Sequence, residues 1–370
     1  MWSGTMTRQI NAARSAFGSS YHGIHRYYRR LSTFIRWHLS LLLIVFTVWL
    51  LIVLMATGPY SKPSKTLIAD STSMSKYPLQ APSRLPPHPY LIFGMPTTHR
   101  KVDLLNPTLD AIDGQLSLDH SDPMFRRITV LIVKNGEEHP SFDRARERFK
   151  GRPDFIFETS RNSSDDADDR SEIGVSWKVQ QHTRDIASMM KIAVKFRPSY
   201  FVFIEDDFSV CPSGLEAILH LLKKAYRFFP NWIALAMSTG MNGIILKKQD
   251  MIPFAKYLVD HQTRRPPDHL IIEWFAGETR ESAAYRQGRP HLTFRYNLMQ
   301  HRGAASTLRD HPAQIVDDCY DVNDIGRMFD VMSFKAIDCG HDDIWPCPTF
   351  NSSVPASVWT PPVLQRSSVH

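Results

Sequence analysis

One apolar stretch near the N-terminus predicts a membrane anchor. Residues 39–56, LSLLLIVFTVWLLIVLMA, contain no charged side chain. At about 1.5 Å per residue, a helix of this length just spans a bilayer whose hydrocarbon core is roughly 27–30 Å thick. Arg36 and His38 precede the stretch, and Gly58-Pro59 follows it. We therefore expect a transmembrane signal anchor over residues 39–56.

After this stretch the chain changes character. Residues 57–89 are rich in Pro, Ser and Lys and show no pattern that would build a core, which is typical of a stem or linker. From residue 90 onward, short apolar runs alternate with segments of helical spacing. We expect an ordered domain over residues 90–350 and a short tail over residues 351–370.

The alternation predicts an α/β fold. Apolar runs predict strands at residues 90–93, 128–133, 155–157, 200–204, 232–237 and 243–246. Helical spacing predicts helices at residues 105–116, 141–150, 175–196, 215–228 and 250–259. Strands that alternate with helices imply a mostly parallel, Rossmann-type sheet covered on both faces.

Charge adds the orientation of the anchor. Residues 1–38 form a basic tail with six arginines and no acidic residue, and the formal net charge of the chain is +7. The positive-inside rule places this tail in the cytosol and the rest in a lumen, as in a single-pass type II protein. A cleaved signal peptide and a mitochondrial presequence are the alternatives, but the long tail disfavours the first and the uncharged span the second. Because the excess charge precedes the anchor, we expect no nucleic-acid partner.

Cysteine usage agrees with a luminal domain. The chain has four cysteines, which permit two disulfides in any of three pairings. Cys339 and Cys347 are close in sequence with Pro346 between them, so a local disulfide is the first expectation. A zinc site is the alternative, but no CxxC spacing is present. Asn162 and Asn351 each begin an Asn-x-Ser sequon, which suits a luminal location.

Three adjacent acidic residues follow a predicted buried strand. Glu205, Asp206 and Asp207 come directly after YFVFI. Ligands bind α/β sheets beyond the carboxyl ends of the strands, and clustered carboxylates there are costly unless a cation or partners meet them. Carboxylate oxygens suit Mn²⁺ or Mg²⁺, which bridge to substrate phosphates, as a nucleotide-sugar transferase requires. The alternative is a strand end whose acids cap the next helix or face water.

Other acidic clusters lack this context. Residues 165–169 are acidic but lie in a segment that is polar throughout, and Asp317-Asp318 and Asp342-Asp343 follow no apolar strand. We expect all three clusters to be solvated.

Five segments in series resemble the catalytic domain of the N-acetylglucosaminyltransferase IV family, which is glycosyltransferase family 54. A Gly-x-Pro-Thr-x-x-Arg turn and a Trp-containing helix lead to the acidic strand, and a Gly turn, a Pro-x-Asp segment and a Gln-His run follow. The similarity covers roughly residues 90–310. The matching positions are Gly94, Pro96, Thr97, Arg100, Trp177, Gln181, Met190, Glu205, Asp206, Asp207, Trp232, Gly243, Asp250, Pro266, Asp268, Leu270, Gln300, His301, Gly303, Ser306 and Leu308.

The resemblance implies a GT-A fold and a function. It implies a Golgi membrane enzyme that moves GlcNAc from UDP-GlcNAc to a mannose of N-glycans on glycoproteins, with inversion. Mn²⁺ or Mg²⁺ would be the cofactor, with Asp207 and His301 as its ligands. Asp268 and Glu273 are the candidates for the catalytic base. The substrate-binding candidates are Pro96, Thr97, Arg100, Gln181, Glu205 and Asp206.

Simpler roles are the alternatives for several of these residues. His301 is alternatively a hydrogen-bonded structural residue, Arg100 a solvated loop residue and Gln181 a core-facing helix residue. Asp268 and Glu273 are alternatively a helix cap and a surface acid.

Departures from the family pattern leave other functions open. Gln180 and Arg184 stand where the family has Lys and Asp, and Ile272 stands where a second acidic residue is expected. Little chain follows residue 350, so we expect no C-terminal lectin-like module. One alternative is an enzyme that adds N-acetylhexosamine to GPI-anchor glycans, although such an enzyme carries a further membrane hairpin. The other is a catalytically inactive sugar-binding membrane protein.

Overall fold

The computed structural model describes residue 47 and residues 88–136, 138–160, 174–302, 318–324, 329–348 and 357–362. The described residues from 88 onward belong to one compact unit. The predicted basic tail, stem and C-terminal tail lie outside the described residues, apart from a few positions, and so does the predicted anchor apart from Thr47. Within the described ranges, no helix combines the length and the apolar character needed to cross a membrane.

A mixed, mostly parallel sheet forms the centre of this unit. Its strands in spatial order are β10 (Ile344–Trp345), β8 (His291–Phe294), β6 (Ala234–Ala236), β7 (Ile244–Lys247), β4 (Tyr200–Phe203), β1 (Leu91–Thr97), β2 (Ile128–Lys134) and β3 (Phe155–Thr159). Strands β4, β1, β2 and β3 run parallel to one another, and β6 and β8 are also parallel. Strand β7 runs against both of its neighbours, and β10 runs against β8.

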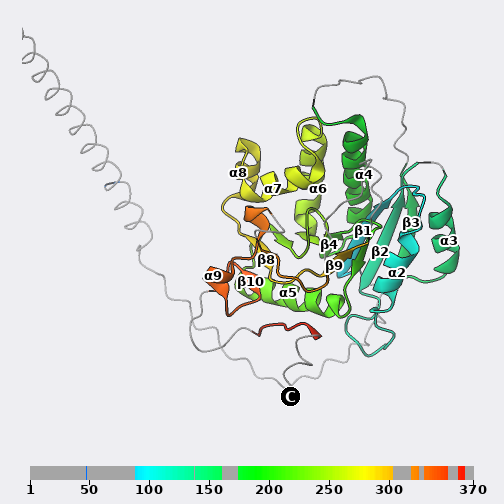
Figure 1. Cartoon of the computed structure of the whole chain (residues 1–370), viewed down its shortest axis with the longest axis horizontal. Coiled ribbons are helices and arrows are strands. Elements are labelled where there is room, and N and C mark those ends of the chain that lie inside the picture. The colour runs from blue at the N-terminus through cyan, green and yellow to red at the C-terminus, as the bar shows by residue number, and fades with distance from the viewer. Residues whose placement is uncertain are drawn as a thin grey trace, which may run out of the picture. The chain divides into compact units, whose positions relative to one another are not determined.

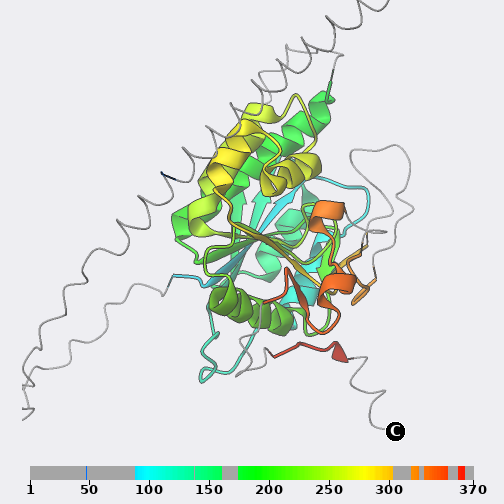
Figure 2. The same ribbon diagram turned by 90° about the vertical axis from the view of Figure 1, so that its left-hand side faces the viewer.

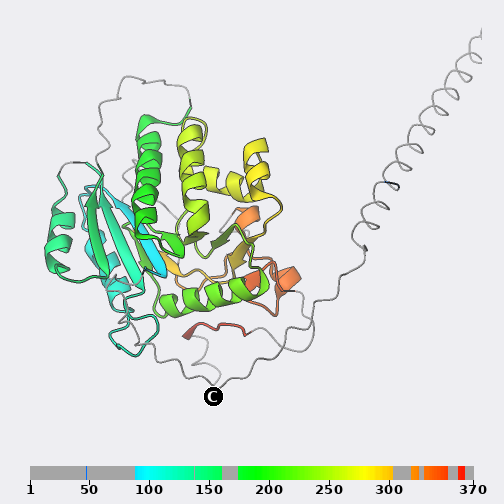
Figure 3. The same ribbon diagram turned by 180° about the vertical axis from the view of Figure 1, so that it is seen from behind.

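Helices cover both faces of the sheet (Figure 1). One layer contains α2 (Leu105–Asp113), α3 (Pro140–Arg148) and α5 (Gly214–Phe228). The other contains α4 (Trp177–Ala193), the short helix η2 (Val194–Phe196), α6 (Lys248–His261), α7 (Pro267–Ala276) and α8 (Arg280–Arg286). Figure 2 shows the sheet between the two layers, and Figure 3 shows them from behind. The predicted α/β architecture is therefore confirmed.

Alternation along the strands explains the two layers. In β1, Phe93 packs into the core beneath α2 and α5, whereas Ile92 packs into the core beneath α4 and α6. Both side chains are fully buried, as expected of a strand covered on both faces. Between them and the strand end, Gly94 lets α4 approach closely, because a Cβ there would lie 2.3 Å from the Met189 sulfur.

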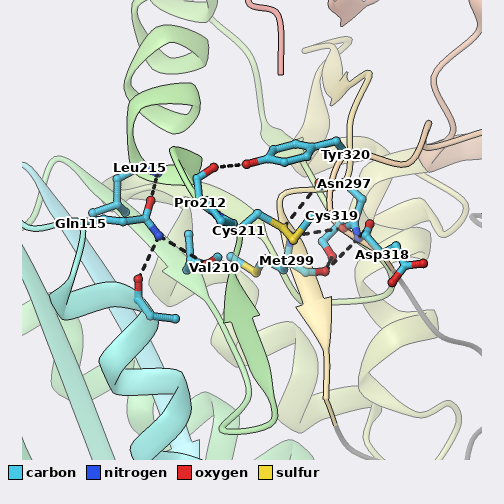
Figure 4. The surroundings of a disulfide bond; sticks show 12 residues. Gln115, Val210, Cys211, Pro212, Leu215, Asn297, Met299, Asp318, Cys319 and Tyr320 are labelled. Atoms are coloured by element: carbon cyan, nitrogen blue, oxygen red, sulfur yellow. Dashed lines mark hydrogen bonds between the residues drawn. A yellow bond between two sulfur atoms is a disulfide. The ribbon is translucent and has the colours of Figure 1, made fainter. Parts of the chain in front are cut away.

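Two disulfides include all four cysteines of the chain. Cys339 bonds to Cys347, which confirms the predicted local disulfide, and Cys211 bonds to Cys319 across 108 residues. The second bond lies beside a small two-stranded sheet formed by β5 (Phe208–Val210) and β9 (Met299–His301). Figure 4 shows its surroundings, where the Tyr320 hydroxyl donates to the Pro212 carbonyl. The described C-terminal part adds η3 (Asp330–Met332) and α9 (Ala336–Cys339).

Candidate functional site

The acidic triplet lies where two sheets meet. Strand β4 ends at Phe203 and β5 begins at Phe208, so the triplet connects the central sheet to the small sheet. Thr97 is the last residue of the neighbouring parallel strand β1. The carboxyl ends of the two parallel strands therefore meet at this edge, as the ligand-binding edge of an α/β sheet requires.

Asp206 is buried and has partners on both carboxylate oxygens. Its Oδ2 accepts a 2.6 Å hydrogen bond from the Thr97 hydroxyl, and its Oδ1 pairs with Arg100 at 2.8 Å. The hydroxyl of Thr108 donates to its main-chain carbonyl at 3.0 Å. Burial raises the pKa of Asp206 to about 6, although Arg100 and Thr97 act in the opposite direction. This carboxylate is held in place rather than solvated.

Asp207 is also buried, but one of its oxygens is unsatisfied. Oδ2 pairs with Arg100 at 2.9 Å and lies 3.6 Å from Nε2 of His301. Oδ1 is buried and has no hydrogen-bond partner among the residues that the structure describes. A buried carboxylate oxygen without a partner is energetically costly, so this position is suited to a cation or a donor.

The small sheet positions His301 beside the Asp207 carboxylate. Phe208 and His301 are register partners in the β5–β9 pair, and their rings stack with centroids 4.4 Å apart. The Arg302 amide then donates to the Asp207 carbonyl at 2.8 Å, which continues the ladder by one bond. The β5–β9 pair therefore brings His301 beside Asp207, although the two residues are 94 positions apart in the sequence.

Glu205 points to a different set of partners. Asn242 accepts from the Glu205 amide at 2.7 Å and donates to its Oε2 at 2.9 Å. On α4, His182 lies 3.1 Å from the other carboxylate oxygen. Burial works against the charge of Glu205, but the bonds from His182 and Asn242 outweigh it and hold its pKa well below the usual range. Neither His182 nor Asn242 was among the predicted site residues.

Asp268 lies in the first turn of helix α7 and is exposed. Its Oδ1 accepts a 2.9 Å hydrogen bond from the Met241 amide. Gly240 adopts a φ of +63° beside it, and a Cβ at that glycine would lie 2.9 Å from the same oxygen. Although the residue keeps an exposed surface, packing of the surrounding protein around part of the carboxylate raises its pKa, and the negative Glu205 adds to the shift. The carboxylate is therefore oriented, accessible and more basic than usual.

The structure places the other candidates differently. Glu273 is buried on α7, where Tyr257, Arg264 and Arg265 surround its carboxylate. These contacts are those of a structural ion pair, and its role as a base stays a prediction. Gln181 donates to Asp185 at 2.9 Å along α4.

One prediction about acidic residues is wrong. Asp342 and Asp343 are fully buried rather than solvated, because both pair with the buried Lys224 of α5. Asp318 is exposed, as expected. Asp317 and the acidic segment 165–169 lie outside the described residues.

The residues at the triplet fit a divalent cation in part. Among the described residues, no group of three His, Cys, Asp or Glu side chains is arranged to hold a metal ion. Asp207 nevertheless offers a buried, unsatisfied Oδ1, and Nε2 of His301 lies 3.6 Å from the other oxygen of the same carboxylate. Mn²⁺ and Mg²⁺ are commonly bound by one or two protein groups, with substrate phosphates and water as the remaining ligands. The donor set is consistent with such a site.

Comparison with known proteins gives only distant structural likeness. No family model and no curated protein matches the sequence. Residues 1–349 of S. aureus TarS are 10% identical over 41% of this chain and 35% of that one, with a TM-score of 0.28. Mannosyltransferase PcManGT from Pyrobaculum calidifontis, solved with GDP-Man and Mn²⁺, is 13% identical over 50% and 52%, with a TM-score of 0.32. Mouse xyloside xylosyltransferase 1 is 11% identical over 55% and 83%, with a TM-score of 0.33.

These likenesses are too weak to assign an activity. The match spans about a third of the S. aureus TarS fragment 1–349. The neighbours named here include sugar transferases, but none of the comparisons identifies glycosyltransferase family 54. The functional argument therefore depends on the geometry of the triplet and its neighbours.

Proposed function

We propose that this chain is a metal-dependent glycosyltransferase of the Golgi membrane. It transfers GlcNAc from UDP-GlcNAc to a mannose hydroxyl of an N-glycan, with inversion, and its domain faces the lumen. One observation carries the transferase proposal. The Asp207 carboxylate lies at the ligand-binding edge of the sheet, where its Oδ1 is buried without a hydrogen-bond partner in the described structure, and its Oδ2 pairs with Arg100 and lies 3.6 Å from Nε2 of His301. The donor, acceptor and location come from the sequence resemblance and the N-terminal pattern.

Asp207 and His301 would hold Mn²⁺ or Mg²⁺, which neutralises the diphosphate charge when bound. Arg100 already lies between Asp206 and Asp207, so its guanidinium is positioned to donate to a phosphate oxygen. Thr97 holds Asp206 in place and thereby fixes the guanidinium. Pro96, beside it in β1, contributes a rigid and buried strand end.

Asp268 is the better candidate for the base. In the reaction, the acceptor hydroxyl oxygen bonds to the anomeric carbon as the bond from that carbon to the UDP oxygen breaks. Asp268 takes the proton of the hydroxyl, and its raised pKa makes it a stronger base. Its Oδ1 is oriented by the Met241 amide, and the carboxylate is open to an incoming substrate.

Replacement of Asp207 by Asn tests the metal site. The change keeps the size of the side chain and removes its charge, so Mn²⁺-dependent binding of UDP should weaken at least tenfold while the melting temperature changes little. The measurement is titration calorimetry of UDP on the full-length chain, with and without Mn²⁺. Asp119→Asn, on an exposed loop, is the matched control. If Asp207→Asn binds Mn²⁺–UDP as tightly as the parent does, the transferase proposal is wrong.

Product analysis tests the substrates. The full-length chain, UDP-GlcNAc and a panel of N-glycan and GPI-glycan acceptors should yield a new GlcNAc only on the mannose-bearing N-glycans. Transfer to a GPI glycan would replace the proposed acceptor. Tight binding of UDP with neither transfer nor donor hydrolysis would instead indicate an inactive sugar-binding protein.

A further inference from the structure

A buried histidine outside the triplet connects to it through Thr97. His139 is 3% exposed and Thr97 is 2% exposed, so water has little access to either. The Nε2 of His139 lies 2.8 Å from the Thr97 hydroxyl oxygen, and that hydroxyl lies 2.6 Å from Oδ2 of Asp206. The three groups form a continuous hydrogen-bonded chain that leads into the site.

The other end of the imidazole fixes the direction of this chain. His139 is the N-cap of α3, and its Nδ1 accepts a 3.2 Å hydrogen bond from the Phe142 amide. An Nδ1 that accepts carries no proton, so the neutral ring carries its proton on Nε2. Burial supports the neutral form, because it lowers the pKa of His139 to about 4. Nε2–H therefore donates to Thr97, and the Thr97 hydroxyl proton is directed to Asp206.

The direction of these hydrogen bonds determines which carboxylate oxygens of Asp206 and Asp207 remain available to a ligand. With Oδ2 of Asp206 occupied by Thr97, the guanidinium of Arg100 bridges the remaining oxygen of Asp206 and Oδ2 of Asp207. That arrangement leaves Oδ1 of Asp207 unsatisfied among the described residues. If the Thr97 hydroxyl loses its donor, its rotation is no longer fixed and the carboxylates can turn.

We propose that His139 is a positioning residue for the donor-binding site, which it orients through Thr97 and Asp206. The role rests on the proposed function, since it concerns the binding of Mn²⁺ and UDP at the triplet. His139 acts on Asp206 through the hydroxyl of Thr97. The start of α3 fixes the conformation of His139. The position of that helix therefore affects the orientation of the Asp206 carboxylate through His139 and Thr97.

Two substitutions separate this role from helix capping. His139→Asn keeps an oxygen acceptor for the Phe142 amide, because Asn is a favoured N-cap, but its amide is too short to reach Thr97. His139→Gln can extend an amide donor toward Thr97, but Gln is not a favoured N-cap residue. His120→Asn, at an exposed loop position, is the control.

Calorimetric titration of Mn²⁺ and UDP on the full-length chain is the test, with thermal melting alongside. His139→Asn should bind Mn²⁺–UDP about tenfold more weakly at a melting temperature near that of the parent, as loss of an outer hydrogen-bond partner usually does. His139→Gln should keep the parent affinity within about twofold and melt at a lower temperature. Parent-like affinity in His139→Asn, or a weaker affinity in His139→Gln than in His139→Asn, would overturn the proposal.

A double-mutant cycle distinguishes the proposed coupling from a general folding defect. Thr97→Val removes the hydroxyl that links His139 to Asp206, so it should weaken binding of Mn²⁺–UDP. Adding His139→Asn to this variant should weaken binding no further. Additive losses would mean that the two residues act separately, which contradicts the proposal. If the parent chain binds no Mn²⁺–UDP, the proposed function itself fails. Normal parent binding with an unaffected His139→Asn removes only the positioning role.

Discussion

Replacement of Lys224 by Met should destabilise the domain strongly. Lys224 lies on α5 with only 3% of its side chain exposed, and its ammonium pairs with Asp342 at 2.6 Å and with Asp343. It also donates to the Ser357 carbonyl at 3.1 Å. Methionine keeps the volume and the apolar stem, so the change removes the charge and leaves two buried carboxylates without their cation.

The magnitude follows from the burial of both carboxylates. Removing one partner of a buried ion pair costs about 3–5 kcal/mol, because the remaining charge is uncompensated. Asp343 retains hydrogen bonds from His220 at 2.9 Å and from the Trp359 amide at 2.7 Å, which keeps the loss near the lower end of that range. We expect the free energy of unfolding to fall by about 3 kcal/mol at pH 7.

The effect should depend on pH in a defined direction. Burial opposes the charge of Asp343, but its bonds from His220 and Lys224 prevail and lower its pKa from 3.8 to about 2. A carboxylate with a lowered pKa stabilises the fold above its unfolded pKa, and this stabilisation is lost as the pH falls from about 4 to about 2. The shift corresponds to roughly 2–3 kcal/mol. In the variant, protonation of Asp343 relieves the unpaired charge, so the gap between variant and parent should narrow at pH 3.

Denaturant unfolding of the full-length chain at pH 7 and pH 3 measures both effects. Lys223→Met changes the adjacent, exposed lysine of the same helix and should alter stability by less than about 0.5 kcal/mol. A second substitution, Asp343→Asn, should restore part of the stability of Lys224→Met, because it removes one uncompensated charge. If Lys224→Met lowers the free energy of unfolding at pH 7 by less than about 1 kcal/mol and by no more than Lys223→Met does, the reasoning is refuted.

Three further predictions concern the rest of the chain. Asp268→Asn should lower kcat by about 10²–10⁴ with little change in UDP affinity, as steady-state kinetics and calorimetry would show. Replacing both cysteines of the Cys211–Cys319 disulfide by Ala should lower the free energy of unfolding by about 3–5 kcal/mol, since the bond closes a loop of 108 residues. Residues 60–370 should be protected from protease in sealed microsomes, and digestion of the large fragment from the cytosolic side would contradict the predicted topology.

Six strands of the central sheet were predicted from their apolar runs, most of which are buried on both faces. Strand β8, HLTF, alternates with polar residues and β10 has only two residues, and neither was predicted. The run at residues 128–133 is continuous and apolar, and the structure gives β2 as Ile128–Lys134. The small sheet was missed, because β5 and β9 have three residues each and carry no periodic pattern. That omission mattered for function, since the β5–β9 pairing is what brings His301 to Asp207. A motif match, rather than any pattern, identified His301.

The partners of the triplet were less predictable than the triplet. Glu205 pairs with Asn242 and His182, and Thr97 pairs with His139, across separations of 23 to 42 residues. Nothing in the local sequence of a polar residue says which distant element will face it. The same reason explains the error at Asp343, whose cation stands 119 residues earlier on α5.

The position of helix α7 distinguishes the two predicted catalytic bases, which the sequence alone did not. Asp268 and Glu273 lie five residues apart on α7, and five residues at about 100° each place their side chains roughly 140° apart around the axis. They therefore face different surroundings. Asp268 lies in the first turn, open to solvent near Glu205, whereas Glu273 lies in the core, paired with Arg264. The apolar run LIIEWFA suits a buried strand or a buried helix equally, so periodicity alone could not separate the two carboxylates. Once the segment is a helix that begins at Pro267, only Asp268 combines access, orientation and a raised pKa.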